Sequence, residues 1–124
     1  MQPQTLNRLA EIVGEENVNT DPAEIYCYSR DSTPYQYFAD VVVRPANTVE
    51  VSRVLKLACE NRTPVYPRGS GTSAAGSPLP VNGGIVLDLT RMNRIIGFDE
   101  ENLQVVLEPG VICDDLNEFL EGYG

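Results

Sequence analysis

The chain has 124 residues, which is enough for one domain with a hydrophobic core. Its 18 acidic and 9 basic residues give a net charge of −9, which excludes the basic surface that nucleic-acid binding requires. Anionic membrane surfaces would repel such a chain, and we expect no membrane insertion because no apolar run approaches the length of a bilayer span.

The cysteines are few and unpaired in their spacing. Cys27, Cys59 and Cys113 form no metal-binding motif, and the chain has no histidine. An odd number of cysteines without a disulfide framework is typical of reduced thiols. We therefore expect no metal site and a cytoplasmic location.

The first elements are two helices. Apolar residues at helical spacing predict a helix over Thr5–Val13, with Gly14 as its C-cap. Asp21 followed by Pro22 predicts the start of a short helix that runs to Tyr28.

A strand, a helix and a second strand follow. The β-branched run Val41–Val43 is typical of a strand that is buried on both faces of a parallel sheet. Thr48 is expected to cap a helix that ends near Asn61, and Pro64–Tyr66 is the next strand. The apolar stripe of this helix is predicted to consist of Val51, Val54, Leu55 and Ala58. Short links between these three elements predict a βαβ unit with parallel strands.

The pattern changes after Gly83 and Gly84. The strands predicted beyond this point are Ile85–Leu89, Ile95–Phe98 and Leu103–Leu107, the last two joined by a polar hairpin turn. Asp114 or Asp115 is expected to cap a final helix. The predicted class is α+β: a small parallel βαβ subdomain with flanking helices over residues 1–82, followed by the start of a second, antiparallel subdomain over residues 83–124.

The stretch from Pro64 to Pro80 is rich in glycine, serine and threonine. Glycine allows positive φ and leaves room for a ligand, so successive main-chain amides can point into one concavity and bind an anionic oxygen. Arg68 adds a guanidinium that suits phosphate, although a local carboxylate is an alternative partner. The chemistry of the stretch predicts a phosphate or pyrophosphate cradle.

Two familiar phosphate-binding motifs do not fit this stretch. A P-loop needs a Gly-Lys-Ser/Thr ending, but the only lysine is Lys56. Gly69, Gly71 and Ala74 match the dinucleotide pattern G-x-G-x-x-G/A literally. That pattern also needs a helix that begins at the loop, and Pro78 and Pro80 prevent one.

Residues Pro67–Ser73 resemble the pyrophosphate loop of the vanillyl-alcohol-oxidase type of FAD-binding domain, also called the PCMH type. Further segments that resemble this family, in the same order, are Leu9–Gly14 with Val18, Tyr28–Ser32, Val42–Val51, Gly84–Leu89 and Glu108–Val111. The resemblance extends over essentially the whole chain, and it is strongest to the flavin subunit of glycolate oxidase and to D-lactate dehydrogenases. It implies an incomplete PCMH-type FAD-binding fold.

The resemblance also implies a cofactor and a site. The residues expected to hold the FAD pyrophosphate are Pro67, Arg68, Gly69, Ser70, Gly71, Thr72, Ser73 and Gly76. Some relatives attach the flavin through a histidine at the position of Thr72, which cannot form that bond, so FAD is expected to bind non-covalently. Val43–Pro45 and Pro109–Gly110 are weaker candidates for an approach to the cofactor.

The resemblance implies a parent enzyme, a flavin-dependent 2-hydroxyacid dehydrogenase or oxidase. Its substrate pocket, with histidines, would lie in later segments, so we expect no catalytic residue in this chain and no activity of the chain alone. The chain is accordingly expected to be an N-terminal fragment, either of a longer protein or from a divided gene. An iron–sulfur or other subunit is an expected partner of the parent, and exposed faces predict that the fragment forms a dimer.

A second hypothesis stays open beside the first. The chain could be a non-catalytic module, from a split or degenerate flavoprotein, that binds a nucleotide or only another subunit. Retention of the loop glycines and hydroxyls favours the first hypothesis.

Overall fold

The computed structural model describes residues 1–123 and has the expected mixed α+β class. Its helices are α1 (Pro3–Val13), α2 (Pro22–Tyr28), α3 (Thr48–Glu60) and α4 (Cys113–Leu120), with short 3-10 turns at Glu15–Asn17 and Glu121–Tyr123. Its strands are β1 (Val18–Asn19), β2 (Val41–Val43), β3 (Val65–Arg68), β4 (Ile85–Asp88), β5 (Ile95–Asp99) and β6 (Gln104–Leu107). No helix in the described part of the chain is long and apolar enough to cross a membrane.

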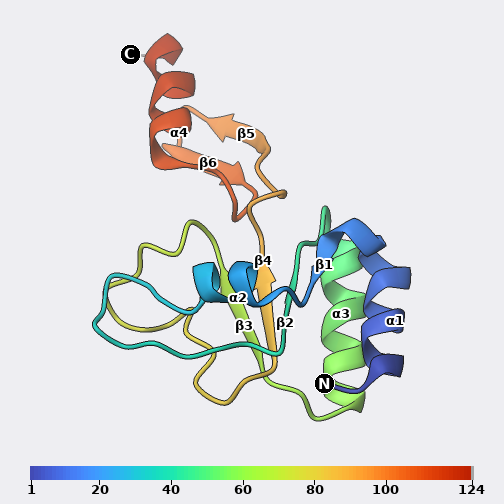
Figure 1. Cartoon of the computed structure of the whole chain (residues 1–124). Coiled ribbons are helices and arrows are strands. Elements are labelled where there is room, and N and C mark those ends of the chain that lie inside the picture. The colour runs from blue at the N-terminus through green and yellow to red at the C-terminus, as the bar shows by residue number, and fades with distance from the viewer. Residues whose placement is uncertain (124) are drawn as a thin grey trace.

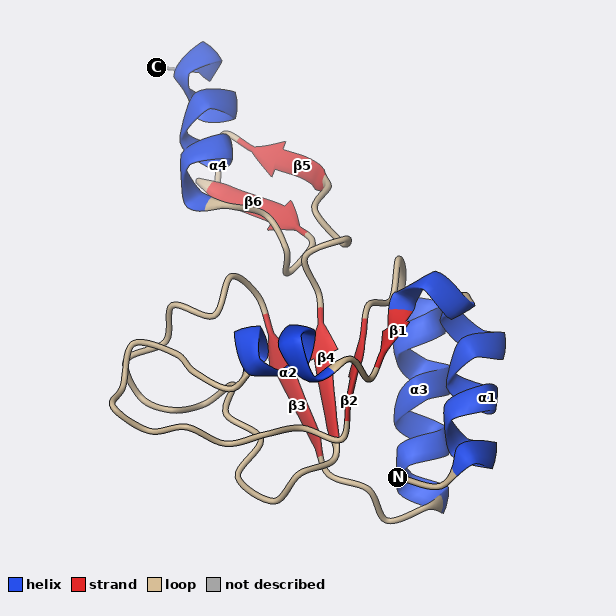
Figure 2. Ribbon diagram, in the orientation of Figure 1, coloured by secondary structure: helices blue, strands red, loops and turns tan. Residues whose placement is uncertain are grey.

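Four strands form the main sheet in the order β1-β2-β4-β3 (Figure 2). Strands β2 and β3 both run parallel to β4, as the sequence predicted for the strands of the βαβ unit, and β1 pairs antiparallel with β2. The two strands of the βαβ unit are therefore not neighbours, because β4 lies between them.

The position of β4 differs from the expectation, which grouped Ile85–Leu89 with the antiparallel strands. The side chains of β4 are buried throughout, and a continuous buried run is typical of a central parallel strand. Gly84 has a φ of 85°, and a Cβ there would collide with the carbonyl oxygen of Pro64. This turn lets the chain enter the sheet beside β3. The division of the chain at residue 82 stays a prediction, and the pairing of β4 favours a boundary after Asp88.

Helices cover both faces of the main sheet (Figure 1). On one face, α1 and α3 enclose the larger core cluster, whose buried members are Leu9, Val13, Val41, Val43, Val54, Leu57, Ala58, Ile85 and Leu87. On the other face, Ile25 and Tyr28 of α2 pack against the smaller cluster of Ala39, Val42 and Val86. Alternate residues of β2 and β4 thus enter opposite clusters, as the two-residue period of a strand requires.

The N-cap of α3 is Asn47 rather than Thr48. The Asn47 Oδ1 accepts a hydrogen bond of 3.0 Å from the Glu50 amide, and the Glu50 carboxylate accepts one of 2.7 Å from the Ala46 amide. This reciprocal arrangement satisfies the Glu50 amide, which the helix leaves unpaired, and the Ala46 amide just before the helix. Asparagine and threonine both carry a side-chain oxygen that can accept a hydrogen bond from a helix amide, so the sequence allowed either Asn47 or Thr48 as the N-cap.

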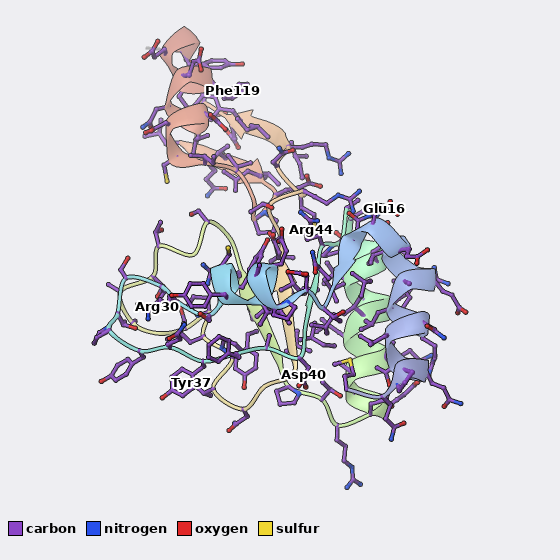
Figure 3. All side chains as sticks on the ribbon, viewed as in Figure 1. Glu16, Arg30, Tyr37, Asp40, Arg44 and Phe119 are labelled. Atoms are coloured by element: carbon purple, nitrogen blue, oxygen red, sulfur yellow. The ribbon has the colours of Figure 1, made fainter. Side chains whose placement is uncertain are left out.

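The antiparallel unit lies beyond the end of the main sheet (Figure 1). It consists of the β5–β6 hairpin and α4, and Figure 3 shows Phe119 on that helix. The helix begins at Cys113 after Ile112, so Asp114 and Asp115 lie in its first turn and neither is the cap. The hairpin is closed at its base by Glu108, which accepts hydrogen bonds from the Arg94 amide at 2.9 Å and the Arg94 Nη2 at 2.6 Å. These bonds hold the pKa of Glu108 below its usual value.

The apolar face of α3 yields a test of the fold. Leu57 is 2% exposed within the core, whereas Leu55, which was assigned to the apolar stripe, is 45% exposed. Leu57→Ala should lower the free energy of unfolding by about 2 to 5 kcal/mol, because it leaves a cavity in the core. The matched change Leu55→Ala should cost about 1 kcal/mol or less. Urea denaturation measures both, and equal losses would contradict the register of α3.

Candidate pyrophosphate-binding site

The glycine-rich loop leaves the main sheet at the carboxyl end of β3. We call residues Gly69–Gly76 the glycine loop. Arg68, the last residue of β3, pairs in register with Asp88, the last residue of β4. The carboxyl ends of parallel strands form the edge at which open α/β sheets bind ligands. The topology therefore places the loop where a ligand site is expected.

The amides at the start of the glycine loop are free. Among residues 1–123, none of the five main-chain amides from Gly69 to Ser73 donates a hydrogen bond. These residues, together with Pro67, Arg68, Ser77 and Pro78, line a hollow of about 240 Å³. Five consecutive donors on one hollow are suited to an anionic group with several oxygens. Seven of the eight residues predicted to hold the cofactor thus lie together, and Gly76 stands at the far end of the loop.

Gly71 is the position in the loop that most clearly requires glycine. Its φ is 75°, and a Cβ there would collide with the guanidinium of Arg68. Any larger residue would have to accept the left-handed conformation and displace the arginine as well. Gly69, in contrast, has room for a Cβ, because the nearest atom is the carbonyl oxygen of Pro109 at 3.7 Å.

The guanidinium of Arg68 lies beneath the loop and contacts the main chain. Its Nη1 donates to the carbonyl oxygens of Arg30 at 2.9 Å and Tyr28 at 3.3 Å. Its central carbon lies 5.3 Å from the centre of the Tyr28 ring. These partners are neither of the two that the sequence suggested, and a direct contact with phosphate stays a prediction.

A hydrogen-bonded pair, half-buried Tyr28 and buried Asp88, lies beside the arginine. The hydroxyl of Tyr28 donates to the Asp88 Oδ2 at 2.6 Å, and the Thr90 amide donates to the Asp88 Oδ1 at 2.9 Å. Asp88 is 3% exposed. Burial, the hydrogen bond to Asp88 and the negative charge of Asp88 together raise the pKa of Tyr28 to about 12, and burial is the largest cause. Tyr28, Asp88, Arg68 and Arg44 line a hollow of about 370 Å³ that adjoins the loop.

The antiparallel unit supplies a third wall. Gly110 packs against the main chain of Leu89 and Thr90, and its amide donates to the Met92 carbonyl at 2.7 Å. A hollow of about 220 Å³ lies between this turn and the glycine loop, lined by Gly69, Ser70, Thr90, Asn93, Pro109, Gly110, Val111, Ile112 and Asp115. Gly69 and Ser70 border all three hollows. The loop can therefore hold the middle of an extended ligand, with space on either side.

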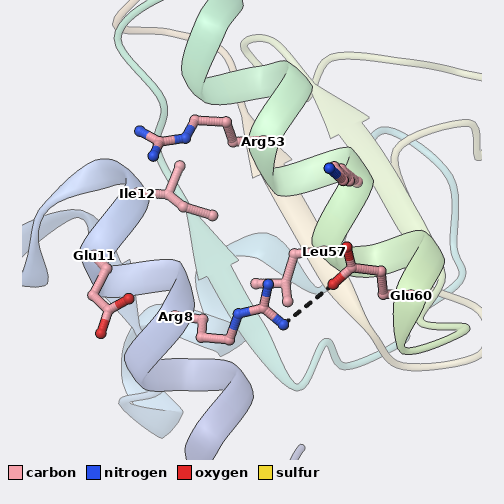
Figure 4. Close-up of a pocket in the computed structure, with 7 residues that line it drawn as sticks. Arg8, Glu11, Ile12, Arg53, Leu57 and Glu60 are labelled. Carbon is pink, nitrogen blue, oxygen red and sulfur yellow. Dashed lines mark hydrogen bonds and ion pairs between the residues drawn. The ribbon is translucent and has the colours of Figure 1, made fainter.

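A separate hollow, of about 290 Å³, lies between α1 and α3 (Figure 4). Arg8 of α1 forms an ion pair of 3.2 Å with Glu60 of α3, and Arg53, Lys56 and Glu11 line the same groove. Its charges are mixed, and it shares no residue with the glycine loop. Within residues 1–123, no group of histidine, cysteine, aspartate or glutamate side chains could hold a metal ion.

The α+β fold and the row of free amides are typical of a domain that binds a diphosphate-containing ligand. A family model described as an FAD binding domain matches residues 39–124. The chain belongs to this FAD-binding family, and FAD is its cofactor. The residues present fit that cofactor, because the free amides of the glycine loop are donors of the kind a pyrophosphate needs.

Two curated relatives support this assignment, and one solved structure shares the fold. The chain is 43% identical over 118 residues to a glycolate oxidase subunit of Bacillus subtilis, covering 94% of this chain and 25% of the relative. It is 34% identical over 125 residues to the mitochondrial D-lactate dehydrogenase (cytochrome) of Arabidopsis thaliana, covering 98% of this chain and 22% of the relative. The structure of p-cresol methylhydroxylase with substrate bound superposes with a TM-score of 0.86, over 97% of this chain and 24% of that chain, at 24% identity. The fold is thus of the PCMH type, as the resemblance implied, and the chain spans about a quarter of the length of these relatives.

The half-buried Tyr28 predicts a pH dependence of stability. The fold raises the pKa of Tyr28 from 10.0 to about 12, so the neutral phenol is favoured in the folded state. The stabilisation that Tyr28 gives the folded state should therefore be complete below pH 10 and should be lost as the pH rises through 12. Tyr28→Phe should lower stability at pH 7 by about 1 to 2 kcal/mol, since it removes a hydrogen bond to a buried carboxylate.

An absorbance titration of the phenolates, combined with urea denaturation, tests this prediction. The wild type should show a titration near 12 that Tyr28→Phe lacks. Tyr26→Phe, at an exposed position on the same helix, is the control and should leave stability almost unchanged. A wild type without a phenolate titration near pH 12 would contradict the Tyr28–Asp88 bond.

Proposed function

We propose that this chain is the FAD-binding part of a flavin-dependent 2-hydroxyacid oxidoreductase, of the glycolate oxidase and D-lactate dehydrogenase kind. The observation that carries the proposal is the row of unbonded amides from Gly69 to Ser73 at the carboxyl edge of a parallel sheet. The names of the relatives, which act on small 2-hydroxy acids, support the reaction class.

The glycine loop would bind the pyrophosphate through main-chain amides and hydroxyls. The residues that we assign to this role are Pro67, Arg68, Gly69, Ser70, Gly71, Thr72, Ser73 and Gly76. Thr72 lacks a ring nitrogen or thiol for attachment to the flavin, so the binding is non-covalent. FAD, when bound, supplies a hydride acceptor for the oxidation of the substrate carbon. The role of this chain is to orient the cofactor by fixing its diphosphate.

The remaining functions would belong to other parts of the protein. Removal of the substrate hydroxyl proton needs a base near neutral pH, for which histidine is the usual choice, and this chain has none. We propose that later segments supply the substrate pocket and that an iron–sulfur or other subunit receives the electrons, in the cytoplasm. Anaerobic bleaching of flavin absorbance by glycolate or D-lactate, measured on the gene product with its flanking coding sequence, tests the reaction class. Failure of every 2-hydroxy acid to bleach the flavin would contradict it.

Thermal melts with excess FAD and then ADP test the loop directly. Each ligand should raise the melting temperature by mass action, worth about 2.7 kcal/mol at 100 times its dissociation constant. Gly71→Ala should abolish the shift with both ligands, because the added Cβ disturbs the floor of the cradle. Gly83→Ala is the matched control, since its φ of 66° imposes similar strain outside the loop while leaving room for a Cβ.

The pattern of shifts separates the possible outcomes. Shifts in the wild type and in Gly83→Ala but not in Gly71→Ala support the pyrophosphate assignment. Equal shifts in all three chains would show that the site lies elsewhere. No shift with either ligand would favour the second hypothesis, a module that is not catalytic and interacts with another subunit.

We also propose that the isolated chain forms a dimer through its antiparallel unit. The hairpin exposes Ile96 by 63%, Leu103 by 82% and Val106 by 59%, and among residues 1–123 the outer edges of its two strands are unpaired. Such edges and apolar patches favour association.

Sedimentation at micromolar concentration measures the association. The wild type should sediment as a dimer, and Ile96→Lys should shift it to a monomer because a charge enters the apolar patch. Val49→Lys, on the exposed side of α3, is the control and should leave the dimer intact. A monomeric wild type would overturn this proposal.

A further inference from the structure

The segment Ser29–Thr33 lies against the far half of the glycine loop, and we call it the bracing turn. The Asp31 Oδ2 accepts a hydrogen bond of 3.0 Å from the Gly76 amide. The Ser32 amide donates to the Ser73 carbonyl at 3.0 Å, and the Ser32 hydroxyl donates to the Thr72 carbonyl at 3.3 Å. Three bonds therefore join two segments that are about forty residues apart in the sequence.

The bracing turn is itself held in place. The Asp31 Oδ1 accepts hydrogen bonds from the Thr33 amide at 2.8 Å and the Thr33 hydroxyl at 2.6 Å. The Arg30 carbonyl accepts the 2.9 Å bond from Arg68, which anchors the other end of the turn to β3. Figure 3 shows Arg30 on the side of the molecule where these loops lie. The hydrogen bonds from Thr33 and Gly76, with the positive charge of Arg68, hold the pKa of Asp31 below its usual value, so the carboxylate is ionised at neutral pH.

These bonds decide which way the loop amides point. In a planar trans peptide unit, the carbonyl and the following N–H point in opposite directions. The Thr72 carbonyl is turned towards Ser32, so the Ser73 N–H in the same peptide unit faces away from the bracing turn. That amide is one of the five unbonded amides, and Ser73 lines the hollow.

We propose that the bracing turn holds the glycine loop in its ligand-ready shape before any ligand arrives, with Asp31 as the positioning residue. The effect of this bracing on ligand binding rests on the proposed function of the glycine loop as a pyrophosphate cradle. A loop with several glycines loses much conformational entropy when it is fixed. The bracing turn moves that loss from the binding step to the folding step, and it thereby strengthens binding without touching the ligand.

A pair of aspartates gives a matched experiment. Asp31→Ala removes an acceptor of two main-chain amides, those of Thr33 and Gly76. Asp21→Ala also removes an acceptor of two main-chain amides, at the start of α2, and neither amide belongs to the glycine loop. Both variants should lose stability, which urea denaturation measures. Only Asp31→Ala should change the glycine loop.

Two measurements separate positioning from stability. The backbone order parameters of residues 69–76, measured by NMR without ligand, should fall from about 0.85 to below about 0.6 in Asp31→Ala and stay unchanged in Asp21→Ala. The dissociation constant for ADP, measured by calorimetry, should rise about tenfold in Asp31→Ala alone. Ser32→Ala keeps the main-chain bond to Ser73 and loses only the bond to Thr72, so it should give a smaller effect in the same direction.

The order parameters decide the proposal. Unchanged order parameters in Asp31→Ala, or equal changes in Asp21→Ala, would overturn it. If Asp31→Ala does not fold, an unchanged loop and an unchanged ADP affinity in Ser32→Ala would overturn it instead. A wild type that binds no ADP would contradict the proposed function of the chain, while the order parameters would still decide whether the loop is braced.

Discussion

The insertion of β4 between β2 and β3 is the constraint on which the site depends. The pairing of Arg68 with Asp88 brings the start of the glycine loop to the end of the central strand. The same edge receives Tyr28 from α2, whose hydroxyl bonds to Asp88. A slip of one residue in β4 would turn Asp88 to the opposite face and separate it from Tyr28, since successive strand residues alternate between faces. The apolar burial of β4 therefore sets the geometry of the polar groups at its end.

The electrostatics of the site are local. A net charge of −9 opposes the approach of an anionic cofactor. Main-chain amides carry partial positive charge that does not depend on the rest of the composition, and five unbonded ones belong to residues that line one hollow. Arg68 places a full positive charge beneath them, although its Nη1 is already bonded to two carbonyl oxygens. The glycine loop therefore offers a ligand the dipoles of its main-chain amides, and the Arg68 guanidinium adds a positive charge behind them.

Much of this arrangement could be predicted from the sequence. Hydrophobic spacing, proline and glycine placed the helices and most strands within a few residues, and the glycine loop was identified from its composition. The central position of β4 was missed, although its buried run, Ile85–Leu87, has the same character as that of β2. Leu55 was placed in the core in place of Leu57. The two leucines lie on opposite flanks of the stripe that Val54 and Ala58 define, and helical spacing alone allows either flank to be the buried one. These errors concern the choice between patterns that the local sequence supports equally.

The bracing turn and the Tyr28–Asp88 bond were missed for a different reason. Asp31 and Thr33 have the spacing of a local Asx turn, which the sequence does show. The bond from Gly76 to Asp31 and the bond from Tyr28 to Asp88 join residues 45 and 60 positions apart, and they exist only after the sheet has formed. Periodicity and local propensity contain no information about such pairs.

The placement of Gly69 and Ser70 on the border of three hollows has a consequence for cooperativity. One of these hollows is walled on its other side by Pro109–Gly110, which belongs to the approach to α4. A ligand that extends from the loop into that hollow contacts both the main sheet and the antiparallel unit. Unfolding of either part would then break contacts with the ligand, so the two parts would melt as a single unit when it is bound. The cofactor would act as a structural link between two bodies that are otherwise joined mainly by a short stretch of chain.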